Sequence, residues 1–146
     1  MMALFAMLAA VFVLDRAAKS LAFRKPGLGG CASLMGMVTI RPACNPRPWP
    51  WPGGSPAAWV LAFGLGLAGA SLMVQVDPLS GPATRAGLGA ALGGALGNLY
   101  DRLRHGAVLD FLCLGRLSRF NLADAALVIG LMAVLVTHAM AAAEAG

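Results

Sequence analysis

The sequence has few charged residues, and acidic residues are the scarcer kind. Only 12% of the 146 residues are charged and only six are Asp or Glu, whereas 59% are hydrophobic. An ordinary soluble domain carries about 25% charged residues, so the composition excludes that class of protein. The mean hydropathy of +0.76 instead predicts an integral membrane protein.

The sequence also lacks the short motifs that hold metals and nucleotides. It contains no HExxH, no CxxC and no phosphate-binding glycine loop, so we predict no metal, no cofactor and no nucleic-acid partner. Cysteine is scarce: Cys31 and Cys44 fall in one predicted loop, and Cys113 is left over. A disulfide within that loop stays open as an alternative, but we expect three free thiols.

Long apolar stretches dominate what is present. A helix needs about 20 residues to cross a hydrocarbon core of about 30 Å. The first stretch has no basic residue before Leu14, which favours a retained helix over a cleaved signal peptide. We predict one all-α membrane domain over residues 1–146, with four transmembrane helices at about 1–23, 56–76, 84–104 and 121–143.

The segment between the first two predicted helices has a different composition. Arg24–Ser55 is rich in Pro and Gly, which remove backbone donors and interrupt helices. We therefore expect a small extramembrane loop or β layer there, in which Ala32–Ile40 supplies a short strand.

The third apolar stretch carries a regular row of glycines. Gly89, Gly93 and Gly97 recur every fourth residue and so share one helical face. Small residues let helices approach closely inside a membrane, so the row predicts a packing surface. The alternative, a mere reflection of a Gly/Ala-rich composition, stays open.

The charged residues gather at one side of the predicted bundle. Three crossings separate the ends of four helices, so the first and third loops share a side. A charge in a bilayer is costly unless it is paired or lines a wet cavity, so a shared polar site is expected. The residues at this level are Asp15, Lys19, Asp101, Arg102, Asp110 and Asp124.

Helical spacing groups these residues further. Asp15 and Lys19 stand four positions apart, which predicts a local ion pair. The other sets that share a helical face are Asn98 with Asp101 and Arg102, and Asn121 with Asp124.

Other catalytic classes fit the sequence poorly. Ser20 directly follows Lys19, and adjacent helical side chains diverge, which argues against a serine–lysine dyad. His138 lies fourteen residues after Asp124, about 21 Å along a helix. His105 lies among basic residues and suits a solvated surface. Paired aspartate chemistry remains.

Two stretches resemble a known family. GNLYDRLRHGAVLDF, residues 97–111, and FNLADAA, residues 120–126, resemble the signature of the lipoprotein signal peptidases, or signal peptidase II. LDRAAK, residues 14–19, resembles the first-helix motif of that family. The resemblance implies an aspartyl endopeptidase of the bacterial inner membrane. Such an enzyme removes the signal peptide of prolipoproteins just before a diacylglyceryl-modified cysteine.

The resemblance also implies residue roles. Asp110 and Asp124 match the catalytic pair, and two close carboxylates share a proton because both cannot ionise cheaply. In the first loop, CNPRPWPWPGG matches the family only at Asn45. The implied substrate-binding residues are Asn45, Asn98, Arg102 and Asn121, and the supporting ones are Asp15, Lys19 and Asp101.

Two predictions of sidedness conflict. Ten of the eleven Lys and Arg residues fall on the side of the first and third loops, which by the positive-inside tendency is cytoplasmic. The resemblance instead places that side in the periplasm, and we adopt the periplasmic assignment. The expected partners are the prolipoprotein substrate and membrane phospholipids. The alternative function is a catalytically inactive relative or a non-enzymatic four-helix scaffold or transport subunit.

Overall fold

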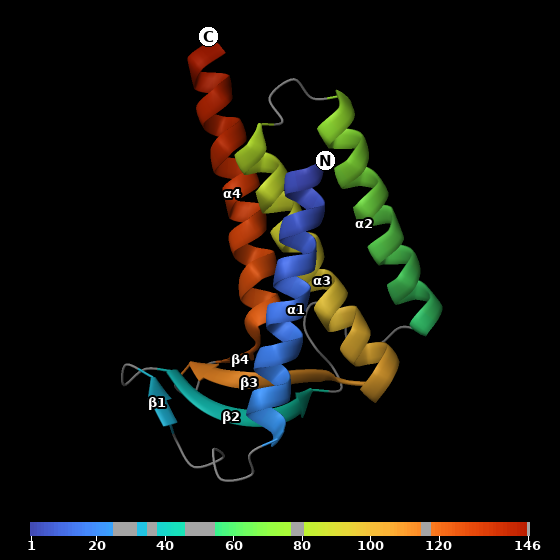
Figure 1. Cartoon of the computed structure of the whole chain (residues 1–146), viewed down its shortest axis with the longest axis vertical. Helices are drawn as coiled ribbons and strands as arrows, with labels where there is room; N and C mark the ends of the chain where they lie inside the picture. The colour runs from blue at the N-terminus through green and yellow to red at the C-terminus, as the bar shows by residue number, and fades with distance from the viewer. Residues whose placement is uncertain (25–31, 35–37, 46–54, 77–80, 115–117, 146) are drawn as a thin grey trace.

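The computed structural model describes residues 1–24, 32–34, 38–45, 55–76, 81–114 and 118–145. Four long helices lie above a small sheet at one end of the molecule (Figure 1). The helices are α1 (Met2–Arg24), α2 (Pro56–Val76), α3 (Pro82–His105) and α4 (Leu122–Ala145), and the strands are β1 (Ala32–Leu34), β2 (Val38–Asn45), β3 (Val108–Leu114) and β4 (Ser118–Phe120).

Local sequence explains where the helices begin and end. Ser55 caps α2 by accepting the Ala58 N–H through Oγ at 3.2 Å. Proline occupies the first turn of α3, where no N–H donor is needed. Gly106 ends α3 in the left-handed conformation, with φ of 67°, and its N–H bonds the Arg102 carbonyl at 3.0 Å.

The four strands form one antiparallel sheet in the order β1-β2-β3-β4. The expectation of a β layer between the first two helices was incomplete, because β3 and β4 lie between α3 and α4. The β3 sequence VLDFLCL is a short apolar run, and periodicity alone does not separate such a run from buried helix. The pairing places Ala43 of β2 opposite Asp110 of β3.

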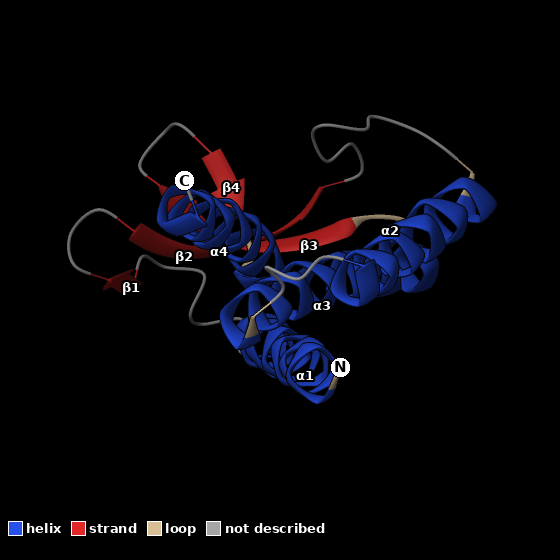
Figure 2. Ribbon diagram, turned by 90° about the horizontal axis from the view of Figure 1, so that it is seen from above, coloured by secondary structure: helices blue, strands red, loops and turns tan. Residues whose placement is uncertain are grey.

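Helix α3 lies at the centre of the bundle, and contacts α1, α2 and α4 (Figure 2). The predicted packing surface is confirmed, because Gly89, Gly93 and Gly97 all contact α1. A methyl group on Gly93 would lie 2.6 Å from an α1 carbonyl oxygen. A second set that the sequence did not indicate, Gly87 and Gly94, contacts α4. Glycine therefore sets the distance between α3 and two neighbours.

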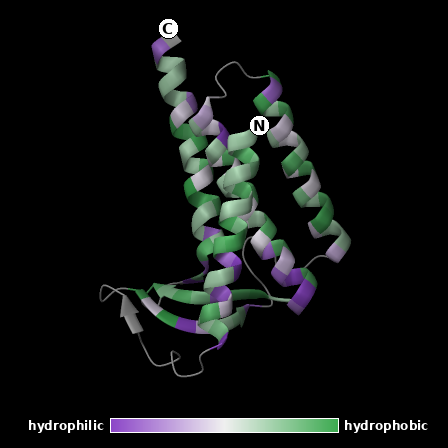
Figure 3. Ribbon diagram, in the orientation of Figure 1, coloured by the Kyte–Doolittle hydropathy of each residue, from purple (hydrophilic) through white to green (hydrophobic). Residues whose placement is uncertain are grey.

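Two of the four expected spans pass a test of length and hydropathy. Within the described residues, α2 and the Leu122–Glu144 part of α4 are apolar enough to cross a membrane. Helices α1 and α3 are not among these two, and hydrophilic residues gather at their lower ends (Figure 3). The exposed apolar side chains of the two passing helices include Leu61, Leu65, Leu72, Val128, Ile129 and Leu135.

Candidate active site

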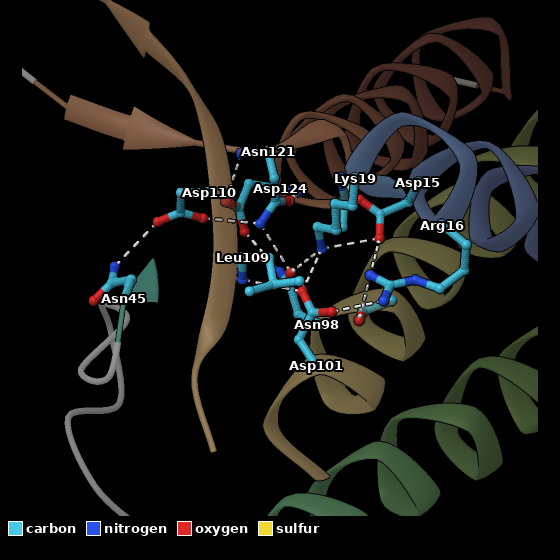
Figure 4. A network of polar contacts seen from close by, with 12 residues as sticks. Asp15, Arg16, Lys19, Asn45, Asn98, Asp101, Leu109, Asp110, Asn121 and Asp124 are labelled. Atoms are coloured by element: carbon cyan, nitrogen blue, oxygen red, sulfur yellow. Dashed lines mark hydrogen bonds and ion pairs between the residues drawn. The ribbon is translucent and has the colours of Figure 1, made fainter. Parts of the chain in front are cut away.

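The polar residues meet where the helix bundle joins the sheet (Figure 4). Asp110 lies on β3 and Asp124 in the first turn of α4, so the chain brings the two carboxylates together from different elements. Asp110 is 2% exposed and Asn121, which directly precedes α4, is fully buried. The site is thus a buried polar layer at the end of an apolar bundle.

Asn121 and Asp124 form the cap of α4. The Asp124 N–H donates to Asn121 Oδ1 at 2.9 Å, and the Asn121 N–H donates back to Asp124 Oδ2 at 3.1 Å. This is a capping box, in which two unpaired backbone donors at a helix start are satisfied reciprocally. The predicted three-residue relationship therefore has a structural reason as well as a chemical one.

The amide of Asn121 also links the two aspartates. Its Nδ2 donates to Asp110 Oδ1 at 3.0 Å and to Asn98 Oδ1 at 3.1 Å. Asn98 Nδ2 in turn donates to Asp124 Oδ1 at 2.7 Å. Two asparagines thus fix both carboxylates with neutral donors, which hold either protonation state of the pair in place.

Asp110 has a raised pKa. Its burial is the largest cause, and the negative charge of Asp124 raises the pKa further. Hydrogen bonds from Asn45 Nδ2, at 3.2 Å, and from Asn121 act in the opposite direction, as does the charge of Lys19. Desolvation outweighs these donors, so Asp110 keeps its proton to a higher pH than an ordinary aspartate does, because its pKa is raised.

A buried ion cluster lies beside the pair. Lys19 Nζ contacts Asp15 at 2.9 Å and Asp101 at 2.6 Å, and Arg16 contacts the same two carboxylates, each at 2.6 Å. The predicted ion pair of Asp15 and Lys19 is confirmed. Both aspartates are fully buried. Two positive and two negative charges balance, which avoids a net charge within the bundle.

The ion cluster also holds the backbone next to each site aspartate. The Leu109 N–H donates to Asp101 Oδ2 at 3.1 Å, one residue before Asp110. The Ala123 N–H donates to Asp15 Oδ1 at 3.1 Å, one residue before Asp124. Asp15 and Asp101 therefore orient the two site carboxylates through the main chain.

Arg102 lies to one side of this network. Asn98 and Asp101 point into the polar layer, whereas the Arg102 guanidinium lies 4.0 Å from the centre of the Trp59 ring on α2. Its charge still acts on the site carboxylates Asp110 and Asp124. The three residues predicted to share a helical face are thus divided between the ion cluster and the α2 side.

Sequence reasoning missed the roles of Arg16 and Trp59. Arg16 pairs with Asp101, 85 positions away, so no local spacing reveals the contact. Trp59 precedes Arg102 by a helix and a loop, and nothing in its own surroundings indicates that partner. The one available signal in the sequence was the position of Arg16, which directly follows Asp15 and lies three residues before Lys19.

No group of three or more His, Cys, Asp or Glu side chains that could hold a metal occurs in the described ranges. Cys44 is exposed and Cys113 is buried, and both are free thiols. Cys31, and residues 46–54 of the first loop, lie outside the described residues.

The fold and site define a largely helical protein with two apolar helices long enough to cross a membrane and a pair of aspartates, of which Asp110 is buried and Asp124 partly buried. Residues 7–140 match the family profile described as signal peptidase (SPase) II. The chain therefore belongs to the signal peptidase II family.

Similar proteins from several bacteria are named lipoprotein signal peptidase. The lipoprotein signal peptidase of Moorella thermoacetica is 48% identical over 69 residues, or 47% of this chain and 46% of that protein. That of Pelotomaculum thermopropionicum is 61% identical over 44 residues, covering 30% and 29%. That of Yersinia pseudotuberculosis is 51% identical over 57 residues, covering 36% and 34%. The matched parts span about half or less of each relative.

Two solved structures share the fold over most of both chains. Each is described as a bacterial membrane enzyme, and each is 20% identical to this chain. One has a TM-score of 0.77 and covers 94% of this chain and 87% of its own. The other has a TM-score of 0.75 and covers 91% and 90%.

Proposed function

We propose that this protein is an aspartyl endopeptidase that removes signal peptides from diacylglyceryl-modified bacterial prolipoproteins. The observation that carries the proposal is the joining of Asp110 and Asp124 through the amides of Asn121 and Asn98. Family membership and the names of the relatives support the substrate class. Within this proposal Asp110 and Asp124 are the catalytic residues.

The two carboxyls divide the chemistry. Burial raises the pKa of Asp110, so Asp110 holds the proton. Asp124 accepts hydrogen bonds from Asn98 and from the Asn121 N–H at a helix N-terminus, and both features stabilise a negative charge. Asp124 takes a proton from water as the water oxygen attacks the scissile carbonyl carbon. Asp110 donates its proton to the carbonyl oxygen.

The resulting tetrahedral intermediate then collapses. The bond between carbon and nitrogen breaks, and Asp124 passes its proton to the leaving amine. One hydroxyl of the intermediate returns a proton to Asp110, which restores the starting state of the pair. No metal and no covalent enzyme intermediate enters these steps.

Substrate contacts come from three sides of the pair. Asn45 reaches Asp110 from β2, Asn98 and Arg102 approach from α3, and Asn121 lies at the start of α4. In this proposal Arg102 donates to backbone carbonyls of the extended substrate near the cleaved bond. Asn45, Asn98 and Asn121 keep the carboxylates in place while water and substrate exchange. Asp15, Lys19 and Asp101 support the site without touching substrate.

All four helices cross the bacterial inner membrane in this proposal, and the sheet and site lie on the periplasmic side. The whole chain is one domain with phospholipid around it. Exposed apolar side chains on α2 and α4 support lipid contact. Asp15, Arg16 and Lys19 of α1 are paired with one another and with Asp101 of α3, which lowers the cost of placing these charges at the membrane.

A pair of substrates tests the substrate class. Purified protein in lipid is incubated with one prolipoprotein, either modified with diacylglyceryl at its cysteine or left unmodified. We expect mass spectrometry to find one new N-terminus, at the modified cysteine, and little product from the unmodified substrate. Equal cleavage of both would contradict the lipid requirement, and no cleavage of either by folded protein would favour an inactive relative or scaffold.

A further inference from the structure

We propose that Trp59 is a positioning residue, whose indole ring holds the Arg102 guanidinium in the orientation that substrate binding requires. The inference rests on the proposed function, because it assigns a task to Arg102 in peptide cleavage. It concerns a contact between α2 and α3 outside the network of asparagines and aspartates.

The contact joins the beginning of one helix to the end of another. Trp59 lies in the first turn of α2, whose start is fixed by the Ser55 cap and by Pro56. Arg102 lies in the last turn of α3. The two helices run antiparallel, and the beginning of α2 lies beside the end of α3 (Figures 1 and 2). The cap of α2 therefore sets where the indole ring lies.

The two arginines near the site are used differently. Both terminal nitrogens of Arg16 donate to protein acceptors, namely Asp15, Asp101 and the Gly97 carbonyl, although its buried Nε has no partner among the described residues. In the described part of the chain, the buried Nε of Arg102 has no hydrogen-bond partner. A guanidinium stacked on a ring keeps its N–H donors in its own plane. Arg102 is thus oriented by an aromatic face, and within the described residues its terminal nitrogens form no ion pair of the kind that Arg16 makes.

A fixed orientation matters because an arginine side chain has many rotamers. An unrestrained Arg102 loses that freedom each time substrate binds. A cation–π contact restricts the side chain beforehand without consuming a donor. Carboxylate pairing, as in Arg16, restricts the side chain but occupies the donors.

Further along its length, α2 packs on α3 in the apolar core, through Ala70 and Val74 against Leu88 and Leu92. A cavity of about 360 Å³ lies further along α2, where it faces α3 and α4. Small residues of α2 and α3 line it, among them Gly66, Gly69, Ala91 and Ala95. The Trp59–Arg102 contact therefore joins the start of α2 to the site.

Three variants test the contact by cleavage kinetics. Trp59→Leu removes the aromatic face, Trp59→Tyr keeps one, and Phe63→Leu is the control, since Phe63 lies one turn along α2 and packs on the apolar core. We expect kcat/KM to fall roughly 5- to 30-fold in Trp59→Leu. Trp59→Tyr is expected to recover most of the loss, and Phe63→Leu to stay near wild type.

A double-mutant cycle separates positioning from general packing. Arg102→Lys keeps the charge but loses the planar group. If Trp59 acts through that group, adding Trp59→Leu to Arg102→Lys reduces kcat/KM by less than 2-fold beyond Arg102→Lys alone. A full additional loss in the double variant overturns the inference, because Trp59 then acts by another route.

A second readout does not depend on activity. The indole ring current shifts the NMR signal of the Arg102 Nε–H. This signal is assigned by its absence from the spectrum of Arg102→Lys. We expect Trp59→Leu to move that signal and Phe63→Leu to leave it. An unmoved signal refutes the contact. If wild-type protein leaves the lipid-modified substrate intact, the proposed function is contradicted. If Trp59→Leu cleaves with wild-type kinetics, only the role of Trp59 is overturned.

Discussion

Asn121 and Asp124 exchange two hydrogen bonds across the first turn of α4, each donating its backbone N–H to the side chain of the other. The same Asn121 side chain donates to Asp110. One residue therefore caps a helix and links the two site carboxylates. The start of α4 and the link between the two carboxylates therefore depend on the same residue.

Substitution of Asn121 separates these two tasks. Serine is a good helix cap but cannot reach Asp110 with an amide. We expect Asn121→Ser to unfold near the wild-type temperature and to lose about 10- to 100-fold in cleavage rate, as for other lost supporting hydrogen bonds. Asn121→Ala loses the cap as well, which costs about 1 kcal/mol of stability. Thermal unfolding in detergent and cleavage kinetics measure the two effects. Full activity in Asn121→Ser would show that the amide bridge is dispensable.

The raised pKa of Asp110 predicts a pH dependence of stability. The folded protein holds the Asp110 proton more tightly than the unfolded chain does. This contribution is complete below the ordinary Asp pKa of about 3.9, and is lost as the pH rises through the raised value. Asp110→Asn cannot ionise, so we expect its unfolding temperature to fall less between acid and neutral pH than that of wild type. Parallel curves for the two proteins would contradict the assignment.

Removal of one charge from the buried ion cluster should destabilise the protein. Lys19 is 2% exposed and contacts both Asp15 and Asp101. Lys19→Met leaves two buried carboxylates with Arg16 alone, and breaking such a pair costs about 3–5 kcal/mol. The control is Arg24→Met at the exposed end of α1. Unfolding in denaturant measures both, and equal stability of the two variants would exclude a structural role for the cluster.

The glycine contacts of α3 predict opposite effects of the same substitution at two positions. A methyl group on Gly93 would meet the backbone and side chains of α1, so Gly93→Ala should push the helices apart and destabilise by roughly 1–3 kcal/mol. Nothing lies within 4 Å of a methyl group on Gly64 of α2. Gly64→Ala should therefore be neutral or slightly stabilising, since alanine favours helix. The difference in unfolding temperature checks this, and a tolerant Gly93 would remove the packing role.

Much of the helical framework could be predicted because apolar length and glycine spacing are local signals. Four helices and the α1-facing glycines follow from them. The sheet could not be assigned in full, because β3 pairs with β2 across about 65 positions of sequence and its apolar run has no clear period. The contacts of Arg16 and Trp59 could not be predicted from the sequence for a similar reason, because each depends on how distant helices meet.

Candidate site residues were easier to predict than their geometry. Asp110 and Asp124 stand out because carboxylates are rare in an apolar chain. Their link through Asn121 and Asn98 requires β3 and two helix ends to converge, which spacing within one helix does not reveal. The backbone contacts of Asp15 and Asp101 likewise depend on tertiary structure.

The most direct test of the central claim is the initial rate of cleavage of a diacylglyceryl-modified prolipoprotein by four matched proteins. These are wild type, Asp110→Asn, Asp124→Asn and the control Glu144→Gln, which changes an exposed carboxylate at the far end of α4. We predict that wild type and the control cleave equally and that each site variant loses at least about 100-fold, while remaining folded. Cleavage at the wild-type rate by either site variant, in its folded form, would contradict an aspartyl pair at this site.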